Sequence, residues 1–210
     1  MRTGLIMAVA AMLVLAPMAR ADWDVGDPYK MHFPQLPKNA GAEMSWRMAD
    51  DWQCTASGPV TDIHFWVSGG EIPPSGPVDA IIYSNIQDGG SGYSIPGPKQ
   101  WDRRFMPSEY TVRPWMVGSE QHWQFNIEDI QDPWIQTEGQ IYWLGLCSSQ
   151  VFWNFSDNHF MDQATIWNDS AKEWQPLGGD MAFVITPEPA TLALLGLGAA
   201  GLVARRRSKK

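Results

Sequence analysis

The chain has little positive charge outside its two ends. Its 210 residues include 15 Lys and Arg against 23 Asp and Glu. The first 21 and last 24 residues hold one acid, Glu188, and seven of the cations: Arg2, Arg20, Arg205, Arg206, Arg207, Lys209 and Lys210. Residues 22–186 therefore keep 8 basic and 22 acidic residues, a net charge of −14. Binding to phosphates needs clustered Lys and Arg, so we expect no nucleic acid partner. We expect the acidic surface to provide solubility; attraction of calcium or cationic groups is the alternative.

Catalytic signatures are also lacking. The sequence contains no G-x-S-x-G, no H-E-x-x-H and no phosphate-binding glycine loop. We therefore expect no enzyme activity, no cofactor and no metal. Four histidines are scattered along the chain, and we expect two of them, His64 and His122, to be surface or rim residues of strands. A hydrolase built on a carboxylate pair such as Asp50 and Asp51 is the alternative.

Both apolar runs of the chain are short for a durable membrane anchor. The first run, Leu5 to Ala16, follows Arg2 and precedes the small-x-small pattern of Ala19 and Ala21. This order is typical of a secretory signal peptide, here residues 1–21. Export implies the secretion machinery and signal peptidase as partners.

The second apolar run lies near the C-terminus. A helix over Ala190 to Ala204 would span about 22 Å, against about 30 Å of hydrocarbon in a bilayer. The basic residues 205–210 should stay cytoplasmic, which places Pro187-Glu188-Pro189 outside. This arrangement favours a temporary stop in the membrane, and an ordinary single-span anchor is the alternative.

These C-terminal elements together resemble the PEP-CTERM sorting signal. The resemblance rests on Pro187, Glu188 and Pro189, the apolar helix after them, and Arg205-Arg206-Arg207 at the end. It implies recognition by an exosortase, a membrane-embedded processing enzyme, with cleavage near Pro-Glu-Pro. It also implies delivery to the cell surface or extracellular matrix, with the membrane contacted only transiently. The tripeptide would then serve recognition, and the arginines would serve as the basic stop.

Cysteine is scarce, with Cys54 and Cys147 as the two examples. Both lie in the exported part, and an oxidising compartment with an even count predicts one disulfide. Two separate buried thiols are the alternative. No C-x-x-C spacing indicates a redox or metal site.

Helical periodicity is missing as well, and short alternating segments replace it. In Val60 to Val67, apolar residues alternate with others, and residues 121–127 repeat the pattern. Further strand candidates are Ala80 to Ile86, Gln140 to Cys147 as a central strand, Val151 to Phe155, Ala164 to Trp167 and Met181 to Ile185. Turn residues separate them. The pattern predicts an all-β domain of about 8–10 short strands, an antiparallel sandwich or jelly roll, with a closed barrel as the alternative.

The expected organisation has four parts. They are the signal peptide 1–21, an irregular lead-in 22–48, the β-sandwich 49–186 and the sorting signal 187–210. The last strand candidate ends two residues before Pro187. We therefore expect the domain to lie close to the membrane before processing.

Tryptophan is abundant, and all 12 tryptophans lie in the mature segment. Many must be buried, because exposing all of them would create adhesive patches. Four stand beside turn residues and are candidates for stacking on sugar rings: Trp101, Trp115, Trp134 and Trp174. Rings that close the ends of the sandwich are the other interpretation.

The mature segment has a resemblance of its own. Asp50 to Cys54, Gly58 to Trp66, Ile141 to Leu144 and Asp180 to Ile185 resemble the framework of an uncharacterised family of exported bacterial β-rich proteins. That family often carries the same tail, and it has no assigned activity. We expect a structural protein of the surface or matrix. The alternative is a carbohydrate-binding module whose partner is an extracellular polysaccharide.

Overall fold

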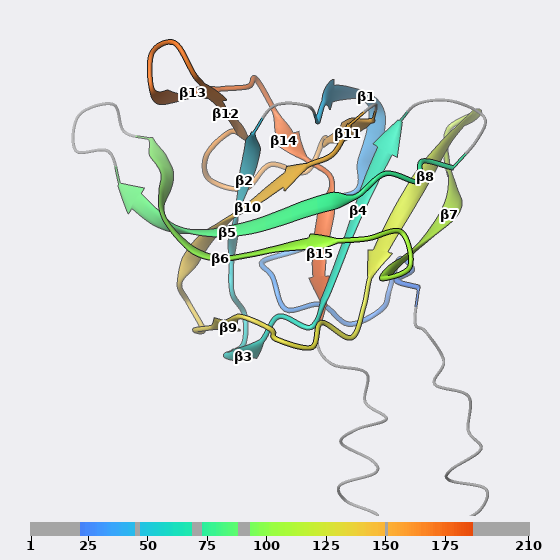
Figure 1. The fold of residues 1–210 in the computed structure, drawn as a ribbon, viewed down its shortest axis with the longest axis horizontal. Helices are drawn as coiled ribbons and strands as arrows, with labels where there is room; N and C mark the ends of the chain where they lie inside the picture. Colours follow the sequence, from blue (N-terminus) through green and yellow to red (C-terminus); the bar gives the residue numbers. More distant parts are fainter. Residues whose placement is uncertain (1–21, 45–46, 69–72, 88–92, 150, 187–210) are drawn as a thin grey trace, which may run out of the picture.

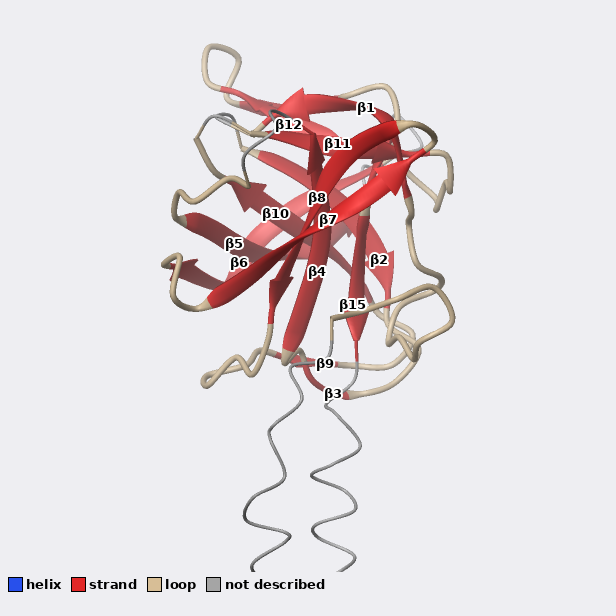
Figure 2. Ribbon diagram, turned by 90° about the vertical axis from the view of Figure 1, so that its right-hand side faces the viewer, coloured by secondary structure: helices blue, strands red, loops and turns tan. Residues whose placement is uncertain are grey.

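The computed structural model describes residues 22–44, 47–68, 73–87, 93–149 and 151–186. Within these ranges the chain forms two antiparallel sheets that pack as a sandwich (Figures 1 and 2). The expected all-β antiparallel sandwich is therefore confirmed. The described residues include no helix that is long and apolar enough to cross a membrane. The expected signal peptide and C-terminal helix lie outside the described residues.

The first sheet has seven strands. Its main path runs β1 (Pro37–Glu43), β11 (Phe152–Ser156), β4 (Asp62–Ser68), β8 (Glu120–Ile127) and β7 (Tyr110–Val117). Two short strands complete it: β14 (Asp180–Met181) pairs with β11, and β15 (Phe183–Thr186) pairs with β4. The C-terminal strands β14 and β15 thus lie within this sheet, whereas β1, from the N-terminal part, forms one of its edges.

The second sheet has six strands. Their order is β13 (Glu173–Pro176), β12 (Thr165–Asn168), β2 (Met48–Gln53), β10 (Ile141–Cys147), β5 (Val78–Gln87) and β6 (Ser94–Phe105). The expected central strand is confirmed, because β10 pairs with β2 on one side and β5 on the other. A small third sheet joins β3 (Gly58–Pro59) to β9 (Ile135–Gln136).

Two expectations about strands are wrong. The lead-in 22–48 is not irregular throughout, because β1 occupies its last part and pairs with β11. The described residues also hold 15 strands, more than the expected 8–10, because several have only two to four residues. Strands β6 and β7 were not among the candidates. Prolines interrupt both sequences, and both strands lie at sheet edges, where a missing amide hydrogen is tolerated.

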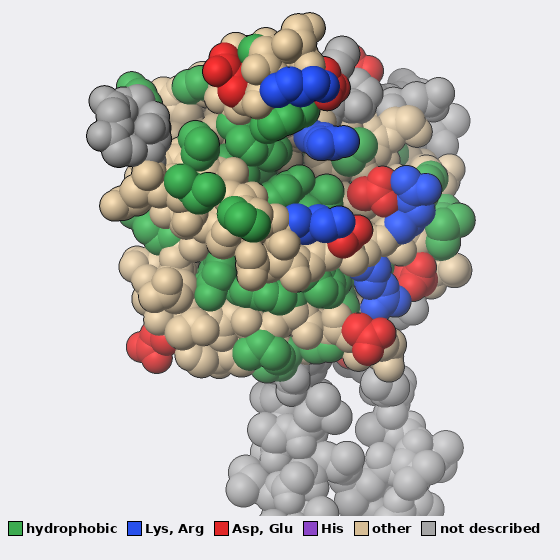
Figure 3. Space-filling model, turned by 60° about the vertical axis from the view of Figure 1, so that its left-hand side comes forward, with side chains coloured by type: hydrophobic (Ala, Val, Ile, Leu, Met, Phe, Trp, Pro, Cys, Tyr) green, Lys and Arg blue, Asp and Glu red, His purple; other side chains and the backbone are tan. Residues whose placement is uncertain are grey.

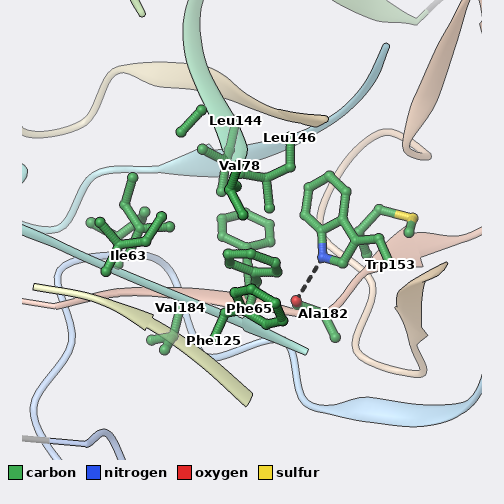
Figure 4. Close-up of a cluster of buried hydrophobic side chains, with 14 of the residues drawn as sticks. Ile63, Phe65, Val78, Phe125, Leu144, Leu146, Trp153, Ala182 and Val184 are labelled. Atoms are coloured by element: carbon green, nitrogen blue, oxygen red, sulfur yellow. Dashed lines mark hydrogen bonds between the residues drawn. The ribbon is translucent and has the colours of Figure 1, made fainter. Parts of the chain in front are cut away.

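Aromatic rings fill the space between the sheets (Figure 4). Phe65 and Phe125 stack with ring centroids 4.9 Å apart, as expected for residues directly opposite each other on β4 and β8. The buried Trp153 points its indole nitrogen at the carbonyl of Ala182, at 2.9 Å, so its polar group is satisfied (Figure 4). This core fixes the positions of the outward-facing groups described next.

Candidate functional site

The predicted processing residues lie outside the described residues: Ala19, Ala21, Pro187, Glu188, Pro189, Arg205, Arg206 and Arg207. The structure does place the residues that adjoin them, Asp22 and Thr186. Thr186 ends β15, where it pairs with Asp62 of β4. Both ends of the described chain lie on one side of the molecule (Figure 1).

A chain of hydrogen bonds joins these two ends across the outer face of the seven-stranded sheet. The Asn126 side-chain amide donates to Asp22 Oδ1 at 2.9 Å, and Asn126 Oδ1 lies 2.7 Å from His64 Nδ1. His64 Nε2 lies 3.3 Å from the hydroxyl of Thr186. An amide oxygen only accepts, so Nδ1 carries the proton and Nε2 accepts from Thr186. Burial lowers the pKa of His64 to about 4, which keeps this neutral form at neutral pH.

The first described residues cover the same face. Trp23 is buried and packs edge-on against Trp66, with ring centroids 5.8 Å apart. Arg113 holds the segment, because its guanidinium donates to the Trp23 carbonyl at 2.6 Å and to Asp24 Oδ1 at 2.7 Å. The N-terminal segment is therefore an integral layer of the fold.

The expectation for His64 and His122 as surface or rim residues is wrong. Each is 1% exposed. The alternation of residue types does place His64 and His122 on the outer face of the seven-stranded sheet. Other segments of the chain cover that face. Nδ1 of His122 lies 2.8 Å from the side-chain amide nitrogen of the buried Asn154. These histidines belong to a polar layer beneath the covering segments.

A group of buried acids lies at the side of the six-stranded sheet. Asp50 Oδ2 accepts from the Gln35 amide and from the backbone N–H of Met181, both at 2.8 Å. Asp180 accepts from the Phe160 backbone at 2.7 Å and lies 2.9 Å from His159 Nδ1. Burial raises the pKa of Asp50 and of Asp180, and their mutual repulsion raises that of Asp50 further. These contacts tie β2 to β14 and to the loop after β11.

Asp51 faces the opposite side of β2 and is fully buried. Among the described residues neither of its oxygens has a hydrogen-bond partner. Burial, followed by the charge of Asp50, raises the pKa of Asp51 to about 9. Asp162 lies close enough to add to that repulsion, and it accepts from the backbone N–H of Ser94 at 3.0 Å. Asp50 and Asp51 thus point away from each other, so they do not form a carboxylate pair facing one bond.

No group of three or more His, Cys, Asp or Glu that could hold a metal occurs in the part of the chain that the structure describes. A pocket of about 210 Å³ lies between β7 and the loop after β8, lined by Arg103, Tyr110, Glu128 and Asp129 among others. Ligand pockets usually measure about 300–1,000 Å³. The pocket is therefore small for an organic substrate.

The predicted disulfide is wrong, because Cys54 and Cys147 are both free thiols. The backbone N–H of Cys54 bonds the Gln140 carbonyl just before β10 begins, whereas Cys147 is the last residue of β10. Gln140 and Cys147 are seven residues apart along an extended strand, which is about 23 Å, and a disulfide needs Cα atoms within about 7 Å. The buried Cys54 thiol instead donates to Gln136 Oε1 at 3.0 Å, and burial raises its pKa to about 12.

The four candidate stacking tryptophans do not form one surface. Trp115 packs on Trp66, at 5.2 Å, on the outer face of the seven-stranded sheet. Trp101 bonds the Asp132 carbonyl at 2.9 Å, and Trp134 packs edge-on against Tyr142 at 4.3 Å. Both of these rings are partly buried against the core.

Trp174 lies apart from the other three, on the outer face of the six-stranded sheet. It contacts Trp167 with centroids 5.4 Å apart and Tyr83 with centroids 5.6 Å apart. Trp167 is directly opposite it in the β12–β13 hairpin. Tyr83 and Trp167 were not predicted, because each sits in an alternating strand where the sequence gives no sign of an aromatic neighbour across the sheet.

Comparison with known proteins gives two matches. Residues 31–191 match the family described as a domain of unknown function (DUF7901). The chain belongs to the DUF7901 family. This DUF7901 protein also matches the PEP-CTERM protein-sorting motif at residues 186–207. No curated protein and no solved structure matches it. The motif identifies the DUF7901 protein as an exported, membrane-sorted substrate of an exosortase.

Proposed function

We propose that the mature domain is a non-catalytic module of the cell surface or extracellular matrix, released when an exosortase cuts near Pro187-Glu188-Pro189. The observation that carries this proposal is the match to the sorting motif directly after a fully paired last strand. The exosortase recognises the tripeptide outside the membrane, while the basic stop Arg205-Arg206-Arg207 holds the other side. Signal peptidase and the secretion machinery act before it.

The buried polar groups support a role without catalysis. Neighbouring strands and loops supply the hydrogen-bond partners of Asp50, Asp180 and His64. A general acid or base must reach a substrate, whereas these groups are covered by protein. Their role in this proposal is to fix the covering segments onto the sandwich.

The position of Thr186 supports close apposition to the membrane before processing. Thr186 is buried and paired with Asp62, so the sandwich continues to the last residue before the sorting motif. The hydrogen-bond chain through His64 brings Asp22, the first residue after the expected signal cleavage, to the same place. Both membrane-directed ends of the precursor thus leave from one edge of the fold.

Intact mass of the extracellular protein, measured with and without the host's exosortase, tests the proposed processing. The expected mass corresponds to a chain that begins at Asp22 and ends near Pro187, in the surface or matrix fraction. A mature protein that retains Leu192 to Lys210 in a host with the enzyme would contradict the proposal. Hydrolysis of a matrix polysaccharide by the purified protein would contradict its non-catalytic part.

A spacer tests the apposition separately. Inserting a short Gly/Ser segment after Thr186 should speed processing, because the exosortase then reaches Pro187 without the folded domain against it. The same segment inserted after Ser170, in the exposed β12–β13 turn, is the control and should leave the rate unchanged. Equal rates for the two insertions would refute the close apposition.

A further inference from the structure

The β12–β13 hairpin folds over the outer face of the six-stranded sheet. Trp174 on β13 and Tyr83 on β5 are four strand positions apart in the sheet order. In a flat sheet, at about 4.8 Å per strand, the backbones of Trp174 and Tyr83 would be about 19 Å apart. Their ring centroids are 5.6 Å apart, so the hairpin must bend toward the sheet. A hairpin that pairs with β2 through only two residue pairs can make this bend.

The Tyr83 ring packs on the backbone of Gly145 in β10. A Cβ added to Gly145 would lie 2.9 Å from Tyr83 Cε2, so the tyrosine ring lies directly over this glycine. Tyr83, Trp167 and Trp174 are each partly exposed, so part of each ring reaches solvent. We call these three residues the aromatic platform. Its rings meet edge to face, at 76° and 70°, which makes the platform stepped.

Positive charge accompanies the platform in a domain that is strongly acidic. Figure 3 shows hydrophobic side chains and Lys or Arg side chains side by side beneath the β12–β13 turn. Two cations of this side are neutralised by carboxylates, in the pairs Arg104–Asp79 and Lys99–Asp102. Arg47 differs, because it is exposed and has no salt bridge with any described residue. The backbone carbonyl of Arg47 accepts from the N–H of Trp167 at 2.9 Å, which places Arg47 beside the platform.

We infer that the aromatic platform and Arg47 bind an anionic polysaccharide, with the rings against the apolar faces of the sugars and Arg47 on a uronic carboxylate. Aromatic rings provide apolar area at low entropic cost, and a guanidinium matches a carboxylate in two parallel hydrogen bonds. The positive charge of Arg47 complements a carboxylate, so the site favours an anionic polysaccharide over a neutral one. This binding role goes beyond export and sorting, and its failure would leave those conclusions intact.

Affinity electrophoresis of the exported mature protein tests the inference, with polygalacturonate in the gel and its methyl ester as the uncharged match. Polygalacturonate should retard the protein, and the ester should retard it less. Trp174→Ala should weaken retention about tenfold, as for a central aromatic contact. Arg47→Gln should weaken it about tenfold on polygalacturonate and leave the ester unaffected. Tyr29→Ala, which removes an exposed ring elsewhere, is the control and should retain wild-type binding.

Three outcomes would overturn the inference. They are no retention of the wild-type protein, equal retention on both polymers, and wild-type retention by Trp174→Ala. If Trp174→Ala does not fold, as judged by its fluorescence in urea, Arg47→Glu takes its place. Arg47 is exposed, so this second variant should fold and should lose retention on polygalacturonate. Retention at the wild-type level would then refute the proposed contact. Intact mass of each variant reports on sorting independently.

Discussion

Replacing Asp51 by asparagine should flatten the dependence of stability on pH. Asp51 has its pKa raised from 3.8 to about 9, chiefly by burial. A carboxyl whose pKa is raised by folding stabilises the protein fully below the unfolded value, and this contribution is lost as pH rises through the folded value. Between pH 7 and pH 8 the folded protein keeps this proton and the unfolded chain does not. The loss is about 1.4 kcal/mol per pH unit and per group.

Between pH 7 and pH 8, most other titrating groups do not change their protonation on unfolding as Asp51 does. The pKa of Asp62 is raised only to about 6, so Asp62 is ionised in both states above that pH. His64, lowered to about 4, works in the opposite direction and only below the unfolded value of 6.5. Asp50 also has a raised pKa and adds its own share to the wild-type slope. The prediction therefore concerns the difference between the wild type and the variant.

Urea denaturation followed by tryptophan fluorescence at pH 7 and pH 8 provides the measurement. The free energy of unfolding of the wild type should fall by about 1.4 kcal/mol more than that of Asp51→Asn over this unit. Asp132→Asn, at an exposed aspartate, should follow the wild type. Parallel curves for wild type and Asp51→Asn would show that Asp51 is ionised in the folded state, and the reasoning from burial would fail.

Three further predictions follow from single contacts. Thiol titration of the exported protein, unfolded without reductant, should give two free thiols from Cys54 and Cys147, and a value of zero would restore the disulfide. Gly145→Ala should destabilise the domain by about 2 kcal/mol in urea, because the new methyl collides with the Tyr83 ring; an unchanged midpoint would contradict that contact. Trp23→Ala should cost about 3 kcal/mol in the same assay, and a loss below about 1 kcal/mol would show that the N-terminal segment is not part of the fold.

Alternation of residue types was enough to predict the sandwich. The strands in Val60 to Val67 and residues 121–127 appear in the structure as β4 and β8, with Phe65 opposite Phe125 in the core. The doubly apolar run at 140–147 became the central strand β10. Local pattern suffices here because each strand faces the same core on one side. Strands that lack this pattern were not predicted. They include the proline-containing edge strands β6 and β7 and the interior strand β2, whose sequence has Asp50 and Asp51 at its middle.

The chemistry of the outer faces could not be predicted in the same way. His64 alternates with core residues and therefore has the pattern of an exposed residue. It is buried because Trp23, 41 positions earlier in the sequence, and its neighbours fold over the sheet. The position of Cys54 relative to Cys147 likewise depends on strand register, which composition does not encode. Contacts between distant segments decide both cases.

The two ends of the sandwich have different roles in the proposed function. Both ends of the described chain lie at the lower end of the molecule in Figure 1, joined through His64. The β12–β13 hairpin, which carries Trp167 and Trp174, lies at the upper end (Figure 1). A precursor still attached to the membrane would thus already present Trp174 and Arg47 outward. In the proposed function, polysaccharide binding and exosortase processing therefore use opposite ends of the domain and do not compete for the same surface.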